Sequence, residues 1–211
     1  MKQLRLRNRD MVLLEALALR IRIISQKQAA EAFWECHIPN ARRRLKQLTG
    51  AGFLKRASAP AQPLPEMIQP ILRWQPGQDF PNANRVSHRL KQRWKFRALL
   101  PTVVYFATKR TTLQFGGKTR SQNKVTQVTH DLGLTATWIR YHQESNRETS
   151  FWVGEDILAP TRRRQKLPDA ALLDRSGNPA LLIEFGGSYA ADRVAAFHED
   201  AALRQLPYHL W

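Results

Sequence analysis

Two amphipathic patterns open the chain. The first follows Asp10, a residue type that caps helices, and keeps its apolar side chains on one helical face: Met11, Leu14, Ala18 and Ile21. Ser25 and Gln28 then have the spacing of a capping box, in which each side chain bonds the backbone of the other residue. The sequence therefore predicts two helices in the first 33 residues.

A third pattern predicts a helix that begins near Pro39 and ends at Gly50 or Gly52. Its apolar face is formed by Ala41, Leu45 and Leu48. Its basic residues point largely elsewhere, and they are Arg42, Arg43, Arg44 and Lys46. The next segment, GFLKR, has the composition of a basic β-strand in which Phe53 and Leu54 pack inward.

The middle of the chain changes character twice. Residues 57–82 are rich in proline and lack a helical period, so we expect a crossing segment there. Residues 82–97 regain the period and predict a helix with Val86, Leu90 and Trp94 directed inward. The other faces of that helix are basic, and we favour core packing for Trp94 and Phe96 over stacking on unpaired bases.

The last half alternates between strand and helix patterns. A β-rich run at 101–108 is followed by a long helix at 121–143, three short apolar runs, a helix at 191–205 and a final strand at 207–211. The second and third apolar runs, PDAALLD and ALLIEFGG, are joined by the turn-forming segment RSGN. This order indicates a mixed α/β core.

Charge separates the two halves of the chain. The whole sequence of 211 residues carries +17, but residues 1–125 hold 25 Lys/Arg and 6 Asp/Glu, a net +19. Residues 126–211 hold 9 Lys/Arg and 11 Asp/Glu, a net −2. Such segregation favours a polyanionic partner for the N-terminal half, although a solvated basic face remains an alternative.

Other features of the sequence limit where in the cell the protein is expected. No apolar run is long enough for a membrane span, and the N-terminal residues lack the apolar core of a signal peptide. Cys36 is the only cysteine, which excludes an internal disulfide and a multi-cysteine zinc site. We therefore expect a protein of the cytoplasm that has no membrane partner.

About the first quarter of the chain resembles a winged helix-turn-helix domain. The resemblance implies that the third helix enters the major groove of double-stranded DNA and that the following strand contacts phosphates. The DNA-contacting residues implied in this way, together with two from the basic helix at 82–97, are Arg42, Arg43, Arg44, Lys46, Lys55, Arg56, Arg89 and Arg93. A winged helix can also serve dimerisation or protein docking, and that alternative stays open.

Carboxylates on neighbouring strands suggest a second kind of chemistry. Asp169 follows a proline at the start of one predicted strand, and Glu184 ends the next, as in the PD-(D/E)xK nuclease-like core. Such a pair can hold Mg²⁺ or Mn²⁺, and Glu155 on a third strand would join it. The nuclease pattern places a lysine two positions after the glutamate, where this chain has Gly186. Lys166, just before the strand of Asp169, or His198 on the following helix could act in its place, whereas Arg193 stays protonated and cannot readily act as a base. We interpret Tyr189 as a packing or DNA-contact residue.

Taken together, the two halves resemble the replication–relaxation family of plasmid mobilisation and replication proteins. The resemblance rests on the basic winged helix followed by THDL, WxxE, PDA and IE, which begin at Thr129, Trp152, Pro168 and Ile183. It implies an N-terminal winged helix at 1–60, a connector with a basic helix at 61–100, and a nuclease-like α/β domain at 101–211.

The sequence thus predicts a DNA-binding protein of a bacterial or mobile-element system, acting in plasmid replication, mobilisation or transcriptional control. Its nuclease-like domain would be catalytically degenerate. The alternatives are a Mg²⁺-dependent endonuclease or nickase acting through Asp169 and Glu184, and a docking adaptor. A homodimer and partner proteins of a DNA-processing complex both remain open.

Overall fold

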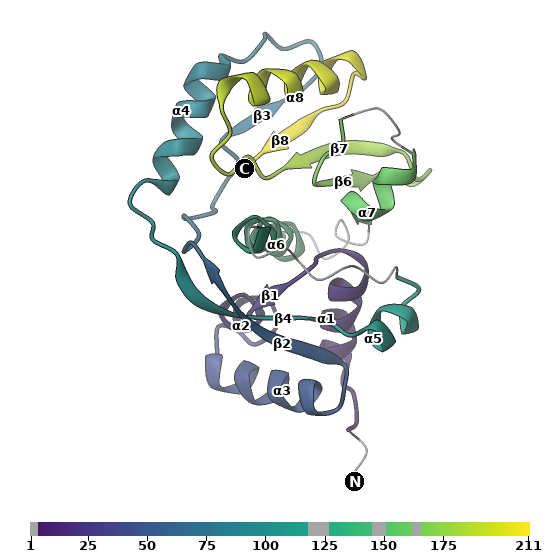
Figure 1. Ribbon diagram of the computed structural model, residues 1–211. Helices are drawn as coiled ribbons and strands as arrows, with labels where there is room; N and C mark the ends of the chain where they lie inside the picture. Colours follow the sequence, from purple (N-terminus) through teal and green to yellow (C-terminus); the bar gives the residue numbers. More distant parts are fainter. Residues whose placement is uncertain (1–3, 118–126, 145–150, 162–165) are drawn as a thin grey trace. The chain divides into compact units, whose positions relative to one another are not determined.

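The computed structural model describes residues 4–117, 127–144, 151–161 and 166–211, and shows a mixed α/β protein with two separate sheets (Figure 1). The chain divides into two compact units. Unit 1 comprises Met1–Pro63 and Leu99–Ile139, and unit 2 comprises Leu64–Ala98 and Arg140–Trp211. This division differs from the three consecutive segments expected from the sequence, because residues 99–139 belong with the N-terminal helices.

The helices of unit 1 follow the sequence pattern closely after the first turn. They are α1 (Asn8–Leu19), α2 (Gln26–Phe33), α3 (Ile38–Gly50) and the short α5 (Lys109–Gln114). Ser25 and Gln28 form the expected reciprocal capping box at α2, with hydrogen bonds of 3.2 and 3.1 Å. The apolar face of α3 is fully buried, as its spacing predicts.

The start of α1 differs from the prediction. The helix begins earlier than Asp10, with Arg7 as its N-cap, and Asp10 is buried in the first turn. Met11 is more than a third exposed, because the buried face of α1 is formed by Leu13, Leu14, Leu17 and Ala18.

The sheet of unit 1 has the order β1-β4-β2 and joins segments that are far apart in the chain. Its strands are β1 (Ile24–Ser25), β2 (Leu54–Ala61) and β4 (Leu100–Ala107). The β2 and β4 strands are antiparallel over eight residue pairs, from Leu54–Ala107 to Ala61–Leu100. Residues 62–99 therefore form one long excursion between two paired strands.

The helix α6 (Val128–Glu144) contributes its first part to unit 1. The Gln28 side-chain amide donates to the Leu132 carbonyl at 2.7 Å, and the Thr135 hydroxyl donates to the Ile23 carbonyl at 2.6 Å. Both bonds are buried, so they fix α6 to the region around β1 and α2. Of the longer helix expected at 121–143, residues 121–126 lie outside the described part of the chain.

Unit 2 is built on a sheet of order β3-β8-β7-β6-β5. Its strands are β3 (Leu72–Trp74), β5 (Trp152–Gly154), β6 (Ala170–Leu173), β7 (Pro179–Glu184) and β8 (Tyr208–Leu210). The β7 and β8 strands are parallel and are connected by α8 (Ala191–Leu203), whereas all other neighbours are antiparallel. The strands and the helix from 170 onward agree with the elements predicted for that part of the chain.

The helix α4 (Ala83–Trp94) packs against α8 and buries Val86 and Leu90 in the core of unit 2 (Figure 1). Trp94 is half-buried and meets the Phe185 ring edge-on at 6.0 Å between centroids. Phe96 is 93% exposed, so core packing was the wrong prediction for that residue. The chain has already left the helix at Phe96, which adopts a left-handed φ of 63°.

Glu155 also differs from its predicted place. The β5 strand ends at Gly154, and Glu155 begins the short helix α7 (Glu155–Leu158) instead of lying on a strand. A 3₁₀ turn, Ala159–Thr161, follows it. Among the residues described, no helix is long and apolar enough to cross a lipid bilayer.

Candidate functional site

The exposed face of α3 carries several cations. Arg42, Arg43 and Lys46 are exposed, and none has an ion-pair partner in the part of the chain that the structure describes. The Arg43 guanidinium donates to the Asn40 side chain at 3.2 Å. Because the opposite face of α3 is buried, the helix presents these charges outward on a rigid support.

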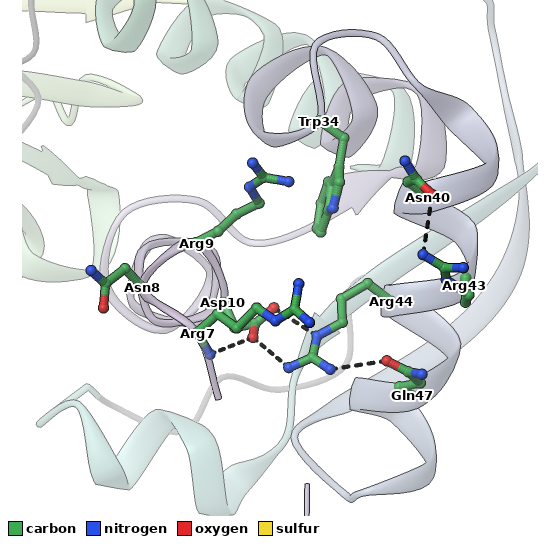
Figure 2. A pocket seen from close by; sticks show the side chains of 9 residues that line it. All are labelled: Arg7, Asn8, Arg9, Asp10, Trp34, Asn40, Arg43, Arg44 and Gln47. Atoms are coloured by element: carbon green, nitrogen blue, oxygen red, sulfur yellow. Dashed lines mark hydrogen bonds and ion pairs between the residues drawn. The ribbon is translucent and has the colours of Figure 1, made fainter. Parts of the chain in front are cut away.

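Arg44 behaves differently from its neighbours in the arginine run (Figure 2). Its Nε donates to Oδ1 of Asp10 at 2.9 Å and its Nη2 donates to Oδ2 at 2.5 Å. Nη2 also donates to the Arg5 carbonyl at 2.8 Å. The hydrogen bonds to Asp10 raise the pKa of Arg44 despite its partial burial. Arg44 therefore ties α3 to α1, and its predicted place among the DNA-contacting residues needs correction.

Asp10 is the acidic partner that the sequence reading treated only as a helix cap. The side chain of Asp10 is 2% exposed and also accepts the N–H of Arg7 at 2.7 Å. Within the arginine run, helical phase already sets Arg44 apart, because it lies three positions after Ala41 and four before Leu48 on the buried side of α3. The signal available was Asp10 itself, an acidic residue beside a strongly basic segment.

The β2 strand extends the exposed basic surface of unit 1. It is an edge strand of the sheet, and Lys55 and Arg56 at its start are exposed. Phe53 and Leu54 before them are buried, as predicted. Lys55 and Arg56 thus lie on the strand that directly follows α3, with both side chains exposed.

In unit 2, the two residues of α4 that are predicted to contact DNA lie in different environments. Arg89 is exposed, whereas Arg93 is half-buried and donates to the Glu66 carbonyl at 2.6 Å. Burial, followed by the charges of Arg89 and Arg97, lowers the pKa of Arg93. Arg93 therefore anchors the segment before α4, and only Arg89 of the pair points to solvent.

Asp169 and Glu184 do come together, as the strand pattern predicts. They lie one position beyond the Ala170–Ile183 pair, where the β6–β7 ladder ends. The N–H of Asp169 donates to Oε2 of Glu184 at 3.1 Å, and the N–H of Phe185 donates to Oδ2 of Asp169 at 2.8 Å. Each carboxylate thus accepts a backbone N–H from the opposite strand, so these two hydrogen bonds link the strands one position beyond the last paired residues.

Tyr189 occupies the remaining oxygen of Glu184. Its hydroxyl donates to Oε1 of Glu184 at 2.5 Å, and the Arg193 guanidinium lies 4.0 Å from the centre of its ring. Burial raises the pKa of Tyr189, and the negative charges of Glu184 and Asp169 raise it further. Tyr189 therefore packs and donates a hydrogen bond inside unit 2, in agreement with the packing interpretation.

The other predicted catalytic residues do not complete a metal site. Nζ of Lys166 lies 3.4 Å from the Arg193 carbonyl, and Glu155 contacts Asp169 through its backbone N–H at 3.0 Å. Among the described residues, no three His, Cys, Asp or Glu side chains form a group that could hold a metal. With three carboxylate oxygens of the pair already facing N–H or O–H donors, this donor set does not fit Mg²⁺ or Mn²⁺ as it stands.

Gly186 explains why no lysine follows Glu184. A Cβ atom at this position would lie 2.9 Å from Cδ1 of Leu210 and 3.0 and 3.1 Å from the two methyl carbons of Leu90. Leu90 belongs to α4 and is 1% exposed. The core of unit 2 therefore fills the space in which the side chain of a nuclease lysine would begin, and this closure could not be read from the sequence.

Comparison of the chain with protein-family models, with curated proteins and with solved structures finds no significant match. The interpretation of the surfaces above therefore depends on their geometry and charge.

Proposed function

We propose that the chain binds double-stranded DNA through unit 1, and that α3 is the helix that enters the major groove. The proposal depends on one observation above all. The α3 helix buries one face completely and presents Arg42, Arg43 and Lys46 on the other, with no carboxylate to neutralise them among the described residues. Arginine suits this surface because its fork can bind guanine edges or backbone phosphates.

The topology of unit 1 supports the same proposal. Three helices are followed by the β2–β4 pair, and β1 joins that pair in a sheet. This is the order of elements in a winged helix, with β2 and β4 as the strands of the wing. The connection between them is unusual in length, because it contains part of unit 2.

Salt titration tests the proposal directly. A labelled 20-base-pair duplex of arbitrary sequence is titrated with the protein by fluorescence anisotropy at several salt concentrations. We expect binding that weakens steeply with salt, because each neutralised phosphate contributes a slope of roughly −0.9 in the log–log plot. Absence of binding at low salt would overturn the proposal.

A paired variant separates DNA binding from a docking role. Replacing Arg42 and Lys46 by alanine removes two exposed cations and leaves the buried face of α3 intact. We expect DNA affinity to fall at least about tenfold, since a good base contact alone contributes roughly 1–3 kcal/mol. A docking adaptor would show the same weak DNA affinity before and after the change.

For unit 2 we propose a nuclease-like fold that does not cut DNA. The order β5, β6, β7, α8, β8 supports the nuclease-like fold, as does the meeting of Asp169 and Glu184. Gly186 and the hydrogen-bonded carboxylates argue against catalysis, because the lysine that would stabilise developing charge has no space.

The endonuclease alternative is tested with supercoiled plasmid in the presence of Mg²⁺ or Mn²⁺. We expect the plasmid to stay supercoiled under conditions in which the protein binds it. Nicking that disappears in Asp169→Ala would instead establish the nickase. In either case we propose replication or mobilisation of a plasmid or another mobile element as the setting, supported by the order of the sequence motifs alone.

A further inference from the structure

A cavity of about 620 Å³ opens in unit 1 between the N-terminal turn of α1 and the outer side of α3. We call it the α1–α3 notch. Figure 2 shows Arg7, Arg9 and Arg43 around it, with Trp34 and the Asp10–Arg44 pair also in its lining. The residues come from α1, α3 and the end of α2, so the notch is a property of how these helices pack.

The notch is positively charged because its one carboxylate is already neutralised. Asp10 accepts hydrogen bonds from Arg44 and from the N–H of Arg7. The guanidinium groups of Arg7, Arg9 and Arg43 have no ion-pair partner among the described residues, and all three side chains are exposed. Three positive charges thus surround a concave surface.

Two further features favour an anion at this place. The first turn of α1 has N–H groups without partners inside the helix, and a helix N-terminus carries partial positive charge. The Arg9 guanidinium also lies 5.6 Å from the centre of the Trp34 ring, and Trp34 is buried. This cation–π contact restrains the Arg9 side chain and reduces the entropy lost when it binds a ligand.

We propose that the α1–α3 notch binds a phosphate group of the DNA backbone and so fixes the position of α3 in the groove. The inference rests on the proposed function of unit 1 and adds a second kind of contact to it. Phosphate contacts orient a protein on the duplex without reading sequence, whereas Arg42 and Lys46 on the exposed face of α3, which do not line the notch, supply the base contacts. Arg7 and Arg9 bind the phosphate oxygens from α1, and Arg43 closes the notch from α3.

The test uses the full chain and a random-sequence duplex. Wild type is compared with Arg7→Ala/Arg9→Ala and with a control that also loses two exposed cations, Lys109→Ala/Arg175→Ala. Thermal unfolding confirms that all three proteins are folded. We expect the notch variant to bind at least about tenfold more weakly, with a log–log salt slope reduced by roughly one to two, and the control to resemble wild type.

Neutral phosphates test the contact from the side of the DNA. In a second duplex of the same sequence, a fixed fraction of the phosphates, spread along both strands, is replaced by methylphosphonates. We expect this duplex to weaken binding by wild type more than binding by Arg7→Ala/Arg9→Ala, because the notch variant uses fewer phosphates.

The outcomes separate the two proposals. If wild type binds DNA and the notch variant binds with unchanged affinity and salt slope, the notch proposal is overturned and the proposed function survives. If wild type does not bind duplex DNA at all, both are overturned. A loss of affinity equal to that of the control also contradicts the notch, since charge alone would explain it.

Discussion

Asp10 decides which arginines of α3 can meet a ligand. Its buried carboxylate holds Arg44 through two hydrogen bonds, while Arg42 and Arg43 on the same helix remain exposed. Adjacent residues of the same type thus have different tasks, one structural and the others available for binding. The difference follows from helical phase and from the position of a single acidic side chain.

This difference gives the first prediction. Arg44→Ala leaves the buried Asp10 carboxylate without its cation, and we expect a loss of roughly 3 kcal/mol in the free energy of unfolding. Arg42→Ala removes an exposed side chain, and we expect a change within about 0.5 kcal/mol. Urea unfolding of the two variants measures both values. Equal stability of the two would show that the ion pair does not hold α3 to α1.

Gly186 carries the second prediction. Any side chain there must displace Leu90 or Leu210, so we expect Gly186→Ala to destabilise the protein by roughly 1–3 kcal/mol. Gly50, at the end of α3, is the matched control, because a Cβ atom there would meet nothing within 4 Å. We expect Gly50→Ala to be neutral or slightly stabilising. A tolerated alanine at 186 would mean that the lysine position is open after all.

His209 makes the stability of the protein depend on pH. It lies half-buried with Nδ1 2.5 Å from the Tyr141 hydroxyl, and burial, aided by the charge of Arg73, lowers its pKa to about 4. The folded protein therefore binds a proton less readily than the unfolded chain, whose histidines titrate near 6.5. Stability is fully present above pH 6.5 and falls as the pH drops toward 4, by about 3 kcal/mol at most.

The variant His209→Asn keeps an acceptor for Tyr141 but does not titrate. We expect its unfolding free energy to change less between pH 6.5 and 4 than that of wild type, as measured by urea unfolding across this range. The slope that remains includes His198, whose pKa is also lowered by burial.

At the scale of elements, local chemistry predicted the helices and strands better than it predicted their partners. The capping box at Ser25 and Gln28 and the spacing of Ala41, Leu45 and Leu48 were confirmed, because both depend on residues a few positions apart. The pairing of β2 with β4 joins residues that are 39 to 53 positions apart, which no local pattern encodes. For the same reason, the sequence did not reveal that Leu90 fills the space beside Gly186.

The capping box yields a prediction for α2. Ser25→Ala removes one hydrogen bond at the helix start, and we expect it to cost about 1 kcal/mol. Gln28→Ala removes the second side chain of the capping box and also the buried hydrogen bond to the Leu132 carbonyl. We therefore expect a loss of about 2 kcal/mol in the free energy of unfolding. Thermal or urea unfolding gives the comparison. Equal losses would show that Gln28 acts only as a cap.

For the whole molecule, the division into units changes the picture of its charge. Residues of unit 1 include 18 Lys/Arg and 5 Asp/Glu, a net +13, whereas those of unit 2 include 16 and 12, a net +4. The positive surplus therefore belongs mainly to unit 1. The positive charge is not confined to the first part of the sequence. In unit 2, α4 adds a smaller basic surface on which Arg89 is exposed.

The paired ends of β2 and β4 allow a prediction about folding autonomy. Joining Ala61 to Leu100 through Asn-Gly, and ending after Glu144, leaves unit 1 with its sheet closed by a two-residue hairpin. We expect this shortened chain to unfold cooperatively and to bind duplex DNA. Residues 1–63 alone should not fold, because β1 and β2 both lose the strand between them.

The long connection between β2 and β4 also affects whether the two units can be separated by cutting the chain. Because the backbone passes from one unit to the other three times, a single protease cut within residues 64–98 does not release the helical unit as an intact fragment. A stop codon near position 100 would remove the central strand of the unit 1 sheet. A simple end-to-end gene fusion cannot easily duplicate or remove one unit alone. We therefore expect the two units to be inherited together.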